Sequence, residues 1–439
     1  EEMIHLPEVG MIARGFLLLS LIFGFVYCTN DSDLLQRLEK AEEMIHLLTK
    51  SLQTLQQTSN SLGYINAVNS PYNAVGDGKT DNTFAVQSAL NAASLAGGGV
   101  VLLPAGNYYF SGTLQIPAST TLKGVWQAPP MSWGSASSIM GTTLLAVNTT
   151  APFLYMAGSN AAIEGISVFY PNQIISSTPI GYPFTIQGNG FNLAVKNVLL
   201  VNSYQGIDFA TYQCGRHYVD GVYGQPLKIG IQVDQCYDIG RIRQVHFWPF
   251  WTQDPTIEAF QGANAITFLF YRSDWEVVED VFSWGYQFGI YFTGSVNGYT
   301  NGQFSNINFD NVDVGIVFNN TQEYGVFISN LNIANAGNGV QHIGILGSSG
   351  GSSHAVIRGA SFWGSIYQCV DWDNSGYLMI SDSFFQPSSS SSSKPAIGLY
   401  AGRAMVRGNY FEDSIPSGVA VQIGSNTDRI MVVDNELVG

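Results

Sequence analysis

Two carboxylic acids near the middle of the chain have a spacing that suits acid–base chemistry on a sugar. Asp274 and Glu276 lie two residues apart in the segment SDWEVVEDVFSWGYQFG. Residues two apart in a β-strand point to the same face, which would place these carboxyl groups roughly 6–7 Å apart. A separation in that range is compatible with a general acid and a general base acting on a glycosidic bond. We therefore predict Asp274 and Glu276 as catalytic residues, with Asp208 in the segment YQGIDF sharing their groove.

A second candidate region is rich in cationic and aromatic side chains. Residues 216–251 read RHYVDGVYGQPLKIGIQVDQCYDIGRIRQVHFWPFW. Exposed rings that stack on sugars, flanked by arginine and carboxylate groups, would form a saccharide groove, and an inward Ile242 would put its two neighbours on the outer face. The predicted substrate-binding residues are Arg216, His217, Asp234, Asp238, Arg241, Arg243, His246, Trp248 and Trp251. The alternative is structural, with the aromatic rings packed under a loop and the arginines paired with Asp234 and Asp238.

Composition narrows the classes of function. The chain has 439 residues and a formal net charge of −15, with 46% hydrophobic and 11% charged residues. It lacks the basic footprint of a general nucleic-acid binder. The six histidines show no paired spacing, so no metal site and no cofactor is expected. Neighbouring aspartates are compatible with Ca²⁺, but no dense acidic loop supports a calcium site.

Two segments are expected before the main body. Residues 11–28, MIARGFLLLSLIFGFVYC, have the arginine and the short apolar run of a secretory signal peptide. Residues 31–62 carry apolar side chains in steps of four and three, the pattern of a coiled coil. We expect this segment to form an oligomeric neck, with a trimer as the first choice by analogy. The alternative is an amphipathic helix folded back onto the body.

Export predicts an extracellular protein and has consequences for two residue types. Asn30, Asn148 and Asn319 each begin an N-x-S/T sequon and are potential glycosylation sites in a eukaryote. Cleavage after Cys28 would leave three cysteines, an odd number, so at least one would be free or intermolecular. Burial of these cysteines as small apolar residues is an equally good interpretation.

From residue 160 onwards a short pattern recurs that predicts stacked coils of strands. An apolar residue and any second residue precede Gly, Asn, Asp or Gln, and alternating apolar positions follow, as in VVEDVFSW. The third member falls at Gly165, Asn197, Gln244, Asp280, Asn306, Asn330, Gly359, Asp382, Gly408 and Asp434. The later intervals of 23–29 residues mark units that bury a face only against their neighbours. Alternation around a corner residue predicts a parallel β-helix, whose longer intervals mark loops that could build a groove.

The segment YNAVGDGKTDNTFAVQSALNAASLAGGGVVLLPAGNYYF, residues 72–110, predicts how one end of the core is closed. Residues 83–96 suit a short amphipathic helix across that end, and three glycines then lead into the first strand. This arrangement resembles the N-terminal region of the pectate-lyase superfamily, in its rhamnogalacturonase/epimerase-like branch. The resemblance is strong over residues 68–123 and continues only as the strand pattern. It implies an all-β fold for residues 63–439, a right-handed, single-stranded parallel β-helix that usually handles polysaccharides.

Two functions follow as hypotheses. The first is a secreted, carbohydrate-active protein that cleaves the glycosidic bonds of a polysaccharide by hydrolysis or β-elimination. The DD, GHG and RIK signatures of polygalacturonases are absent, so that particular activity is not carried over. The second hypothesis is a non-catalytic, oligomeric extracellular protein with a structural or polysaccharide-binding role. The sequence stops directly after a strand pattern, so we expect another subunit or further chain to cover that end of the core.

Overall fold

The computed structural model of the chain describes residues 32–61, 63–127, 129, 140–336, 341–388, 393–412 and 415–438. It separates into two units, Glu1–Tyr64 and Ile65–Gly439. The predicted signal peptide at 11–28 and the sequon at Asn30 lie outside the described residues.

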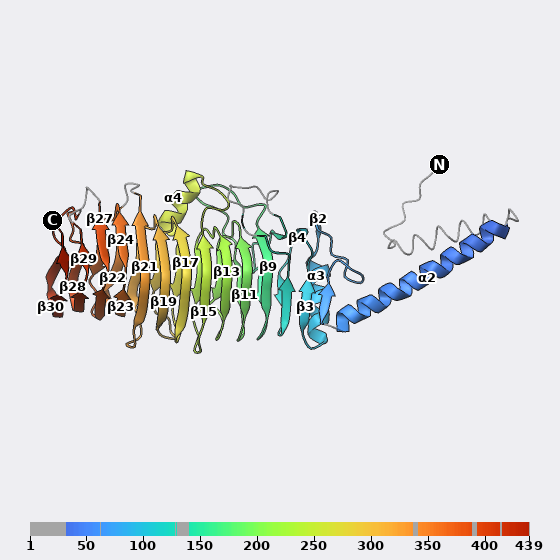
Figure 1. Ribbon diagram of the computed structural model, residues 1–439, viewed down its shortest axis with the longest axis horizontal. Helices are drawn as coiled ribbons and strands as arrows, with labels where there is room; N and C mark the ends of the chain where they lie inside the picture. Colours follow the sequence, from blue (N-terminus) through green and yellow to red (C-terminus); the bar gives the residue numbers. More distant parts are fainter. Residues whose placement is uncertain are drawn as a thin grey trace. The chain divides into compact units, whose positions relative to one another are not determined.

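Parallel strands dominate the second unit, as predicted (Figure 1). The helices among the described residues are α2 (Ser32–Ser61) in the first unit, and α3 (Thr83–Leu95) and α4 (Pro255–Asn264) in the second. The first strands are β1 (Tyr64–Asn66), β2 (Asp77–Asp81), β3 (Gly99–Leu102), β4 (Gly106–Phe110), β5 (Leu114–Ile116), β6 (Thr120–Lys123), β7 (Thr142–Ala146) and β8 (Leu154–Met156). The middle strands are β9 (Ala162–Phe169), β10 (Phe184–Gly188), β11 (Ala194–Leu200), β12 (Gln205–Phe209), β13 (Tyr218–Gly224), β14 (Ile229–Val233), β15 (Arg241–Phe247), β16 (Ile266–Phe270), β17 (Glu276–Trp284), β18 (Phe288–Phe292), β19 (Gly302–Asp310), β20 (Val314–Asn320) and β21 (Val326–Asn335). The last are β22 (Ile343–Ser352), β23 (His354–Arg358), β24 (Ser361–Gly364), β25 (Gln368–Trp372), β26 (Tyr377–Ser381), β27 (Phe384–Pro387), β28 (Ile397–Arg407), β29 (Tyr410–Phe411), β30 (Val421–Val433) and β31 (Glu436–Leu437).

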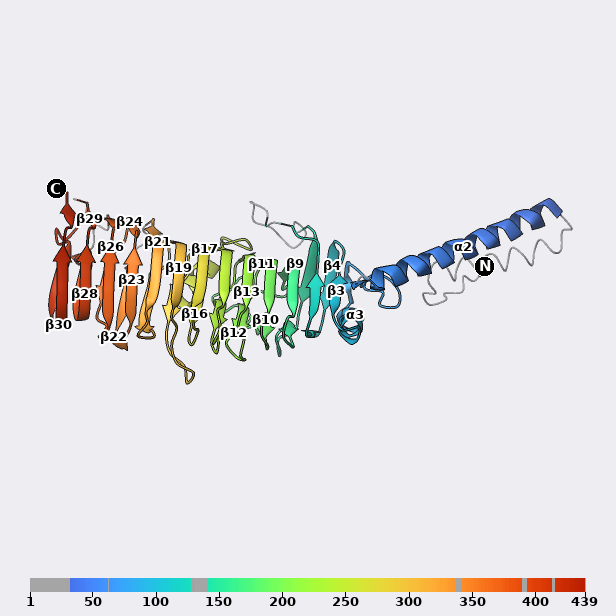
Figure 2. The same ribbon diagram turned by 60° about the horizontal axis from the view of Figure 1, so that its bottom comes forward.

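Each middle coil consists of one short and one long strand. The short strands pair from coil to coil, as β12 does with β14, and the long strands pair likewise, as β13 does with β15. A long strand forms two sides of the coil because it bends in its middle. The part of β9 before its bend pairs with β6, and the part after it pairs with β7. The result is a three-sided parallel β-helix whose coils follow one another in sequence order (Figure 2).

The bend of each long strand occurs at a residue with left-handed backbone. All ten predicted corner residues have φ between 50° and 72°. Glycine adopts this conformation freely, and Asn and Asp tolerate it better than most other residues. The sequence pattern missed one corner, Gly221, with φ of 70°. It lies 24 residues after Asn197 and 23 before Gln244, so it divides the longest predicted interval into two ordinary coils.

The interior is filled by side chains that stack in register. Phe270, Phe292 and Phe318 are fully buried and occupy equivalent positions on successive short strands. Their ring centroids are 5.8 and 5.1 Å apart along the stack. Burial of each such ring contributes about 1.5–3 kcal/mol.

The same register aligns charged side chains on the outer face of the long strands. Six residues on consecutive coils lie opposite one another in pairs. In order, they are Lys123, Glu164, Lys196, Asp220, Arg243 and Glu279, so the sign of the charge alternates at every step. Three of the five neighbouring pairs are ion pairs within 4 Å.

The predicted capping helix is present as α3. It packs against β3, β5 and β6 at the first coils, and its buried residues are Val86, Ala89, Leu90 and Ala93. The apolar residues at its two ends, Phe84 and Leu95, are 84% and 90% exposed and do not contribute to the cap.

Helix α2 covers nearly the whole segment predicted as a coiled coil. Leu48, a residue of the predicted seam, is 56% exposed in the single chain. Assembly through this helix stays a prediction. Within the described residues, no helix is both long enough and apolar enough to cross a membrane.

The corner conformation predicts different effects for two substitutions of Asn306, whose φ is 54°. We expect Asn306→Val to lower the free energy of unfolding by about 1–2 kcal/mol, the cost of left-handed backbone for an L-residue. Asn306→Gly should change it much less. Asn308→Val, on the same strand but outside the corner, is the matched control. Denaturant unfolding measures all three variants, and equal effects of valine and glycine at position 306 would contradict the prediction.

Candidate functional site

The longest interval between observed corners contains an inserted helix. Gln244 and Asp280 are 36 residues apart, and α4 lies between them at the arrowhead ends of the neighbouring long strands (Figure 1). The residues at the start of α4 are typical of a helix N-terminus. The Asp254 side chain accepts a hydrogen bond from the backbone N–H of Thr256 at 2.9 Å, and Pro255 occupies the first turn.

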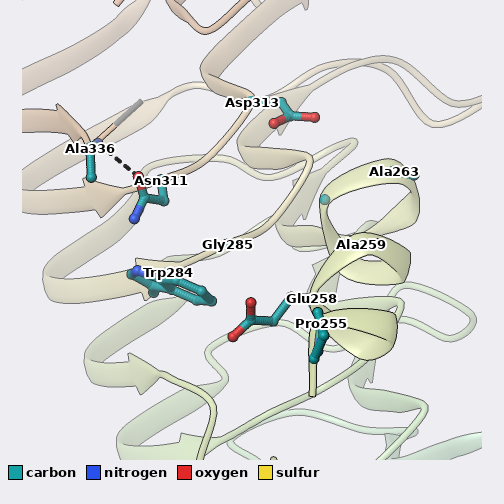
Figure 3. Close-up of a pocket in the computed structure, with 10 residues that line it drawn as sticks. Pro255, Glu258, Ala259, Ala263, Trp284, Gly285, Asn311, Asp313 and Ala336 are labelled. Atoms are coloured by element: carbon teal, nitrogen blue, oxygen red, sulfur yellow. Dashed lines mark hydrogen bonds between the residues drawn. The ribbon is translucent and has the colours of Figure 1, made fainter. Parts of the chain in front are cut away.

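A cleft of about 510 Å³ separates α4 from the ends of β17, β19 and β21. This volume is in the usual range for small-molecule pockets. The cleft is lined by Pro255, Glu258, Ala259, Gly262, Ala263, Trp284, Gly285, Asn311, Asp313 and Ala336 (Figure 3).

Two carboxylic acids line the cleft, and both have raised pKa values. Burial raises the pKa of Glu258, and the nearby charge of Asp254 adds to the effect. Burial alone raises the pKa of Asp313 to about 6. The Glu258 carboxylate extends from α4 toward Trp284 (Figure 3). Carboxylic acids with raised pKa values in a cleft are candidates for general acid–base catalysis.

The surroundings of Asp313 contain a neutral histidine. Nδ1 of His342 lies 3.6 Å from the Asp313 carboxylate and 3.0 Å from the carbonyl oxygen of Val312. Burial lowers the pKa of His342, although the Val312 carbonyl opposes this shift. His342 is therefore neutral at pH 7 and does not hold Asp313 in its charged form.

An aromatic wall supports the cleft beside Glu258. The Trp284 ring packs against Trp248 at a centroid distance of 5.7 Å, and Trp248 packs against Phe282 at 6.1 Å. His246 joins this cluster through Phe282, and burial lowers its pKa. Trp248 and His246, predicted to bind substrate, therefore belong to the packing behind the cleft. Trp251 is fixed nearby, where its backbone N–H donates to the Gln225 side chain at 3.0 Å.

Sequence reasoning missed both cleft carboxylates. They are 55 residues apart in sequence, and only the insertion of α4 brings Glu258 beside the coil that carries Asp313. Two signals were available: the long interval after Gln244, and the segment DPTIE, which combines a capping Asp, a proline and an early glutamate, as helix starts do.

The predicted pair Asp274 and Glu276 does not share a face. The prediction assumed a continuous strand, but β17 begins only at Glu276 and the residue between them, Trp275, has φ of 60°. Asp274 is held at the surface by Arg272 at 2.8 Å and by the Gln322 side chain at 2.6 Å. Glu276 points inward and is completely buried. The two carboxylates therefore cannot act from one groove.

Glu276 belongs to a closed buried network with His217. His217 Nε2 lies 2.9 Å from Glu276 Oε1, and His217 Nδ1 lies 3.0 Å from the Cys214 carbonyl. The Ser273 hydroxyl donates to the second carboxylate oxygen. Burial acts to lower the pKa of His217, but the Glu276 carboxylate overrides this effect and the pKa is well above its ordinary value. The Glu276 carboxylate therefore favours the protonated form of His217 inside the core.

This network also contains the one group of possible metal ligands among the described residues. Donor atoms of His217, Cys236 and Glu276 all lie within 4.8 Å of one another. The hydrogen bonds of the histidine and the carboxylate are already satisfied by protein atoms, and the Cys236 thiol donates to the Asp238 carbonyl at 2.9 Å. The arrangement needs no ion to explain it.

Asp208 and Asp234, also predicted site residues, are saturated with hydrogen bonds. Asp208 is completely buried and accepts from the side chains of Gln187 and Gln232 at 2.7 and 2.9 Å, and from two backbone N–H groups. Asp234 accepts from the side chains of Ser295 and Asn297 at 3.1 and 3.0 Å, and from two further backbone N–H groups. Both carboxylates tie turns together.

The predicted arginine-rich groove is divided between the two ends of β15. Arg241 precedes this strand's corner and Trp248 follows its last residue, so the cationic and aromatic parts do not meet. Arg216 forms an ion pair with Asp238 at 2.8 Å, which also lowers the pKa of Asp238. Arg243 pairs with Asp220 in the ladder of alternating charges. Arg216 thus matches the structural alternative, whereas Arg243 pairs with Asp220 rather than with Asp234 or Asp238, and Arg241 is exposed.

Two predicted glycosylation sites and three cysteines lie within the described residues. Asn148 and Asn319 are partly exposed, and glycosylation at either stays a prediction. Cys214, Cys236 and Cys369 are buried and unbridged. Burial raises the pKa of the Cys214 thiol to about 12.

The His217–Glu276 pair predicts a large effect on stability. We expect Glu276→Gln to lower the free energy of unfolding by about 3 kcal/mol, because it leaves a buried imidazolium without its counter-charge. Since the pKa of His217 is raised, the contribution of the pair is complete below about pH 6.5 and is lost as pH rises through the raised value. The difference in the free energy of unfolding between wild type and Glu276→Gln should therefore become smaller only at alkaline pH.

Thermal and denaturant unfolding across a pH series measure this effect. Glu279→Gln is the matched control, because Glu279 lies on the same strand but half-exposed in the charge ladder. A stability loss no larger than that of the control would show that the buried pair contributes little.

Comparison with known proteins shows which family model this sequence matches. A family model described as rhamnogalacturonase A/epimerase, pectate lyase-like, matches residues 64–341. Alginate lyase 7 of Azotobacter vinelandii is 58% identical over 41 residues, which are 9% of this chain and only 5% of that enzyme.

Two solved structures share the fold at low sequence identity. The catalytic unit of the GH87 α-1,3-glucanase of Streptomyces thermodiastaticus aligns with a TM-score of 0.54 and 11% identity, over 86% of this chain and 69% of that one. A tailspike protein of the E. coli bacteriophage HK620, in complex with a pentasaccharide, aligns with a TM-score of 0.53 and 13% identity. The alignment covers 87% of this chain and 68% of the tailspike chain. These similarities establish the β-helix fold.

Proposed function

Since the chain belongs to the rhamnogalacturonase A/epimerase, pectate-lyase-like family, we propose that it binds a polysaccharide and cleaves its glycosidic bonds in the α4 cleft. The observations that carry the proposal are two carboxylic acids with raised pKa values in one cleft: Glu258, which extends toward the Trp284 ring, and Asp313. An aromatic face and two carboxyl groups are what a glycosidase needs to position a sugar and to move protons.

The chemistry of the cleft favours hydrolysis over β-elimination. Elimination from a uronate requires a cation that neutralises the sugar carboxylate, and none of the ten lining residues is a lysine or an arginine. With a pKa of about 6, Asp313 is protonated over a useful pH range and would act as the general acid. Glu258 would then act in its charged form, as the base or the nucleophile.

A second candidate function is recognition without catalysis. Helix α2, with its exposed seam residue Leu48, supports an extracellular oligomer that presents several β-helices to a polymer. In this alternative the predicted signal peptide would again direct export and the predicted neck would again assemble the chains. The cleft would bind sugar without turnover.

The proposed roles predict how cleft variants behave. Glu258→Gln and Asp313→Asn should each reduce kcat at least about 100-fold, the usual effect of removing a general acid or base. Activity of the unmodified chain should fall as pH rises above about 6, because Asp313 loses its proton. Reducing-end release from a panel of neutral and acidic polysaccharides, read with the ultraviolet absorbance of unsaturated products, measures the reaction and identifies its class.

Glu279→Gln is again the control, since this residue lies outside the cleft. Wild-type rates in both cleft variants would rule out the α4 cleft as the active site. Binding without any product from the whole panel would favour the recognition alternative.

The neck predicts a change in assembly. Deleting residues 32–61 should reduce the molar mass in solution from an oligomer to a monomer, because the apolar seam is removed. Light scattering after size-exclusion chromatography measures this change. An oligomer of unchanged size would place the interface in the β-helix instead.

A further inference from the structure

Five successive turns of the β-helix each carry one exposed aromatic side chain. These turns connect a short strand to the next long strand, from β12–β13 to β20–β21. The residues are Tyr212, Tyr237, Trp275, Tyr299 and Tyr324, with exposed fractions between 41% and 70%. We call this set the aromatic ladder. It lies at the starts of the long strands, whereas the α4 cleft lies at their ends.

The turns that carry the ladder stack directly on one another. The backbone N–H of Asp274 donates to the Cys236 carbonyl at 2.8 Å, and that of Asn301 donates to the Ser273 carbonyl at 3.0 Å. The short strands before the central turns are in register, so these turns leave their strands about 4.8 Å apart, the spacing of neighbouring strands. That step is close to the length of one pyranose unit along an extended polysaccharide.

Side-chain hydrogen bonds fix the central turns. The Asn301 side chain accepts from the Trp275 backbone N–H and donates to the Gln322 side chain, both at 2.6 Å. Gln322 in turn donates to Asp274, and the Arg272 guanidinium, which pairs with Asp274, lies 5.6 Å from the centroid of the Tyr237 ring. The backbone that carries these rings is therefore ordered before any ligand binds, which lowers the entropic cost of binding.

The groove at the centre of the ladder is mostly apolar, with a few polar groups among its lining residues. A groove of about 390 Å³ contains Trp275, Tyr324 and Phe327 together with Asn301, Gln303 and Arg241. The exposed aromatic faces and the exposed Gln303 amide match a sugar polymer, whose rings present C–H faces and whose edges present hydroxyl groups. Arg241 is exposed and forms no ion pair within 4 Å with the described acidic residues, although its charge acts on the nearby Asp238 carboxylate, so its guanidinium is accessible to an acidic sugar.

We propose that the aromatic ladder is a second polysaccharide-binding surface, on which an extended chain lies along the stack of coils with its sugar rings on successive aromatic side chains. This proposal rests on the proposed function and extends it, because it places polymer capture on a surface separate from the cleft. Arg241 at the central groove favours polymers that carry carboxylate or sulfate groups.

The test uses the full chain and a panel of soluble neutral and acidic polysaccharides. Affinity electrophoresis and calorimetry should show that Trp275→Ala/Tyr324→Ala weakens binding at least about tenfold. Trp275→Phe/Tyr324→Phe should retain most of the affinity, because the aromatic faces remain. Trp363→Ala, which removes a ring of 46% exposure elsewhere on the body, should bind like the unmodified chain. Arg241→Gln should weaken binding to acidic polymers only.

Separate readouts distinguish this proposal from the function proposed for the cleft. Asp313→Asn should lose product formation and keep polymer binding, whereas the alanine double variant should lose binding and retain cleavage of short oligosaccharides. Unchanged polymer binding by Trp275→Ala/Tyr324→Ala would overturn this proposal. An equally large loss of polymer binding in Trp363→Ala would overturn it too. The absence of binding by the unmodified chain to every polymer in the panel would overturn it as well.

Discussion

The left-handed bend in each long strand is the constraint on which the rest of the body depends. It lets one strand form two sides of a coil, and its recurrence at equivalent positions keeps successive coils in register. The conformation is unfavourable for most side chains, by about 1–2 kcal/mol, which explains the restriction to Gly, Asn, Asp and Gln. Contacts between corners offset part of this cost, as where Asn306 donates to Asp280 at 2.8 Å and accepts from Asn330 at 3.1 Å.

A scaffold fixed in this way leaves the connections free to differ. Strands of neighbouring coils occupy equivalent positions in the β-helix. The connections differ: the segment after Gln244 contains a helix, and the turns from Tyr212 to Tyr324 carry exposed rings. Both surfaces adjoin β17, one at each end of the strand. The chemistry assigned to Glu258 and Asp313 and the rings that would hold a polymer therefore depend on the same packed core, although no residue belongs to both.

The fold could be predicted from the sequence because its signals are local. Corner residues, alternating apolar positions and the capping helix each occupy a few consecutive residues, and the omission of Gly221 left the architecture unchanged. The site could not be predicted in the same way. Strand alternation failed at Asp274 and Glu276 because a single left-handed residue, Trp275, reverses the direction of the next side chain. The cleft carboxylates were missed because a helix from one coil and a turn from another meet only in three dimensions.

The ladder of alternating charges has a consequence for folding. In a stack of similar coils, a strand that skipped one coil would still find apolar partners and backbone hydrogen bonds of nearly the right kind. It would, however, bring Lys123 opposite Lys196 and Glu164 opposite Asp220, and like charges in directly opposed positions are destabilising. The alternating charges on the outer face of the strands therefore disfavour a register in which one coil is omitted.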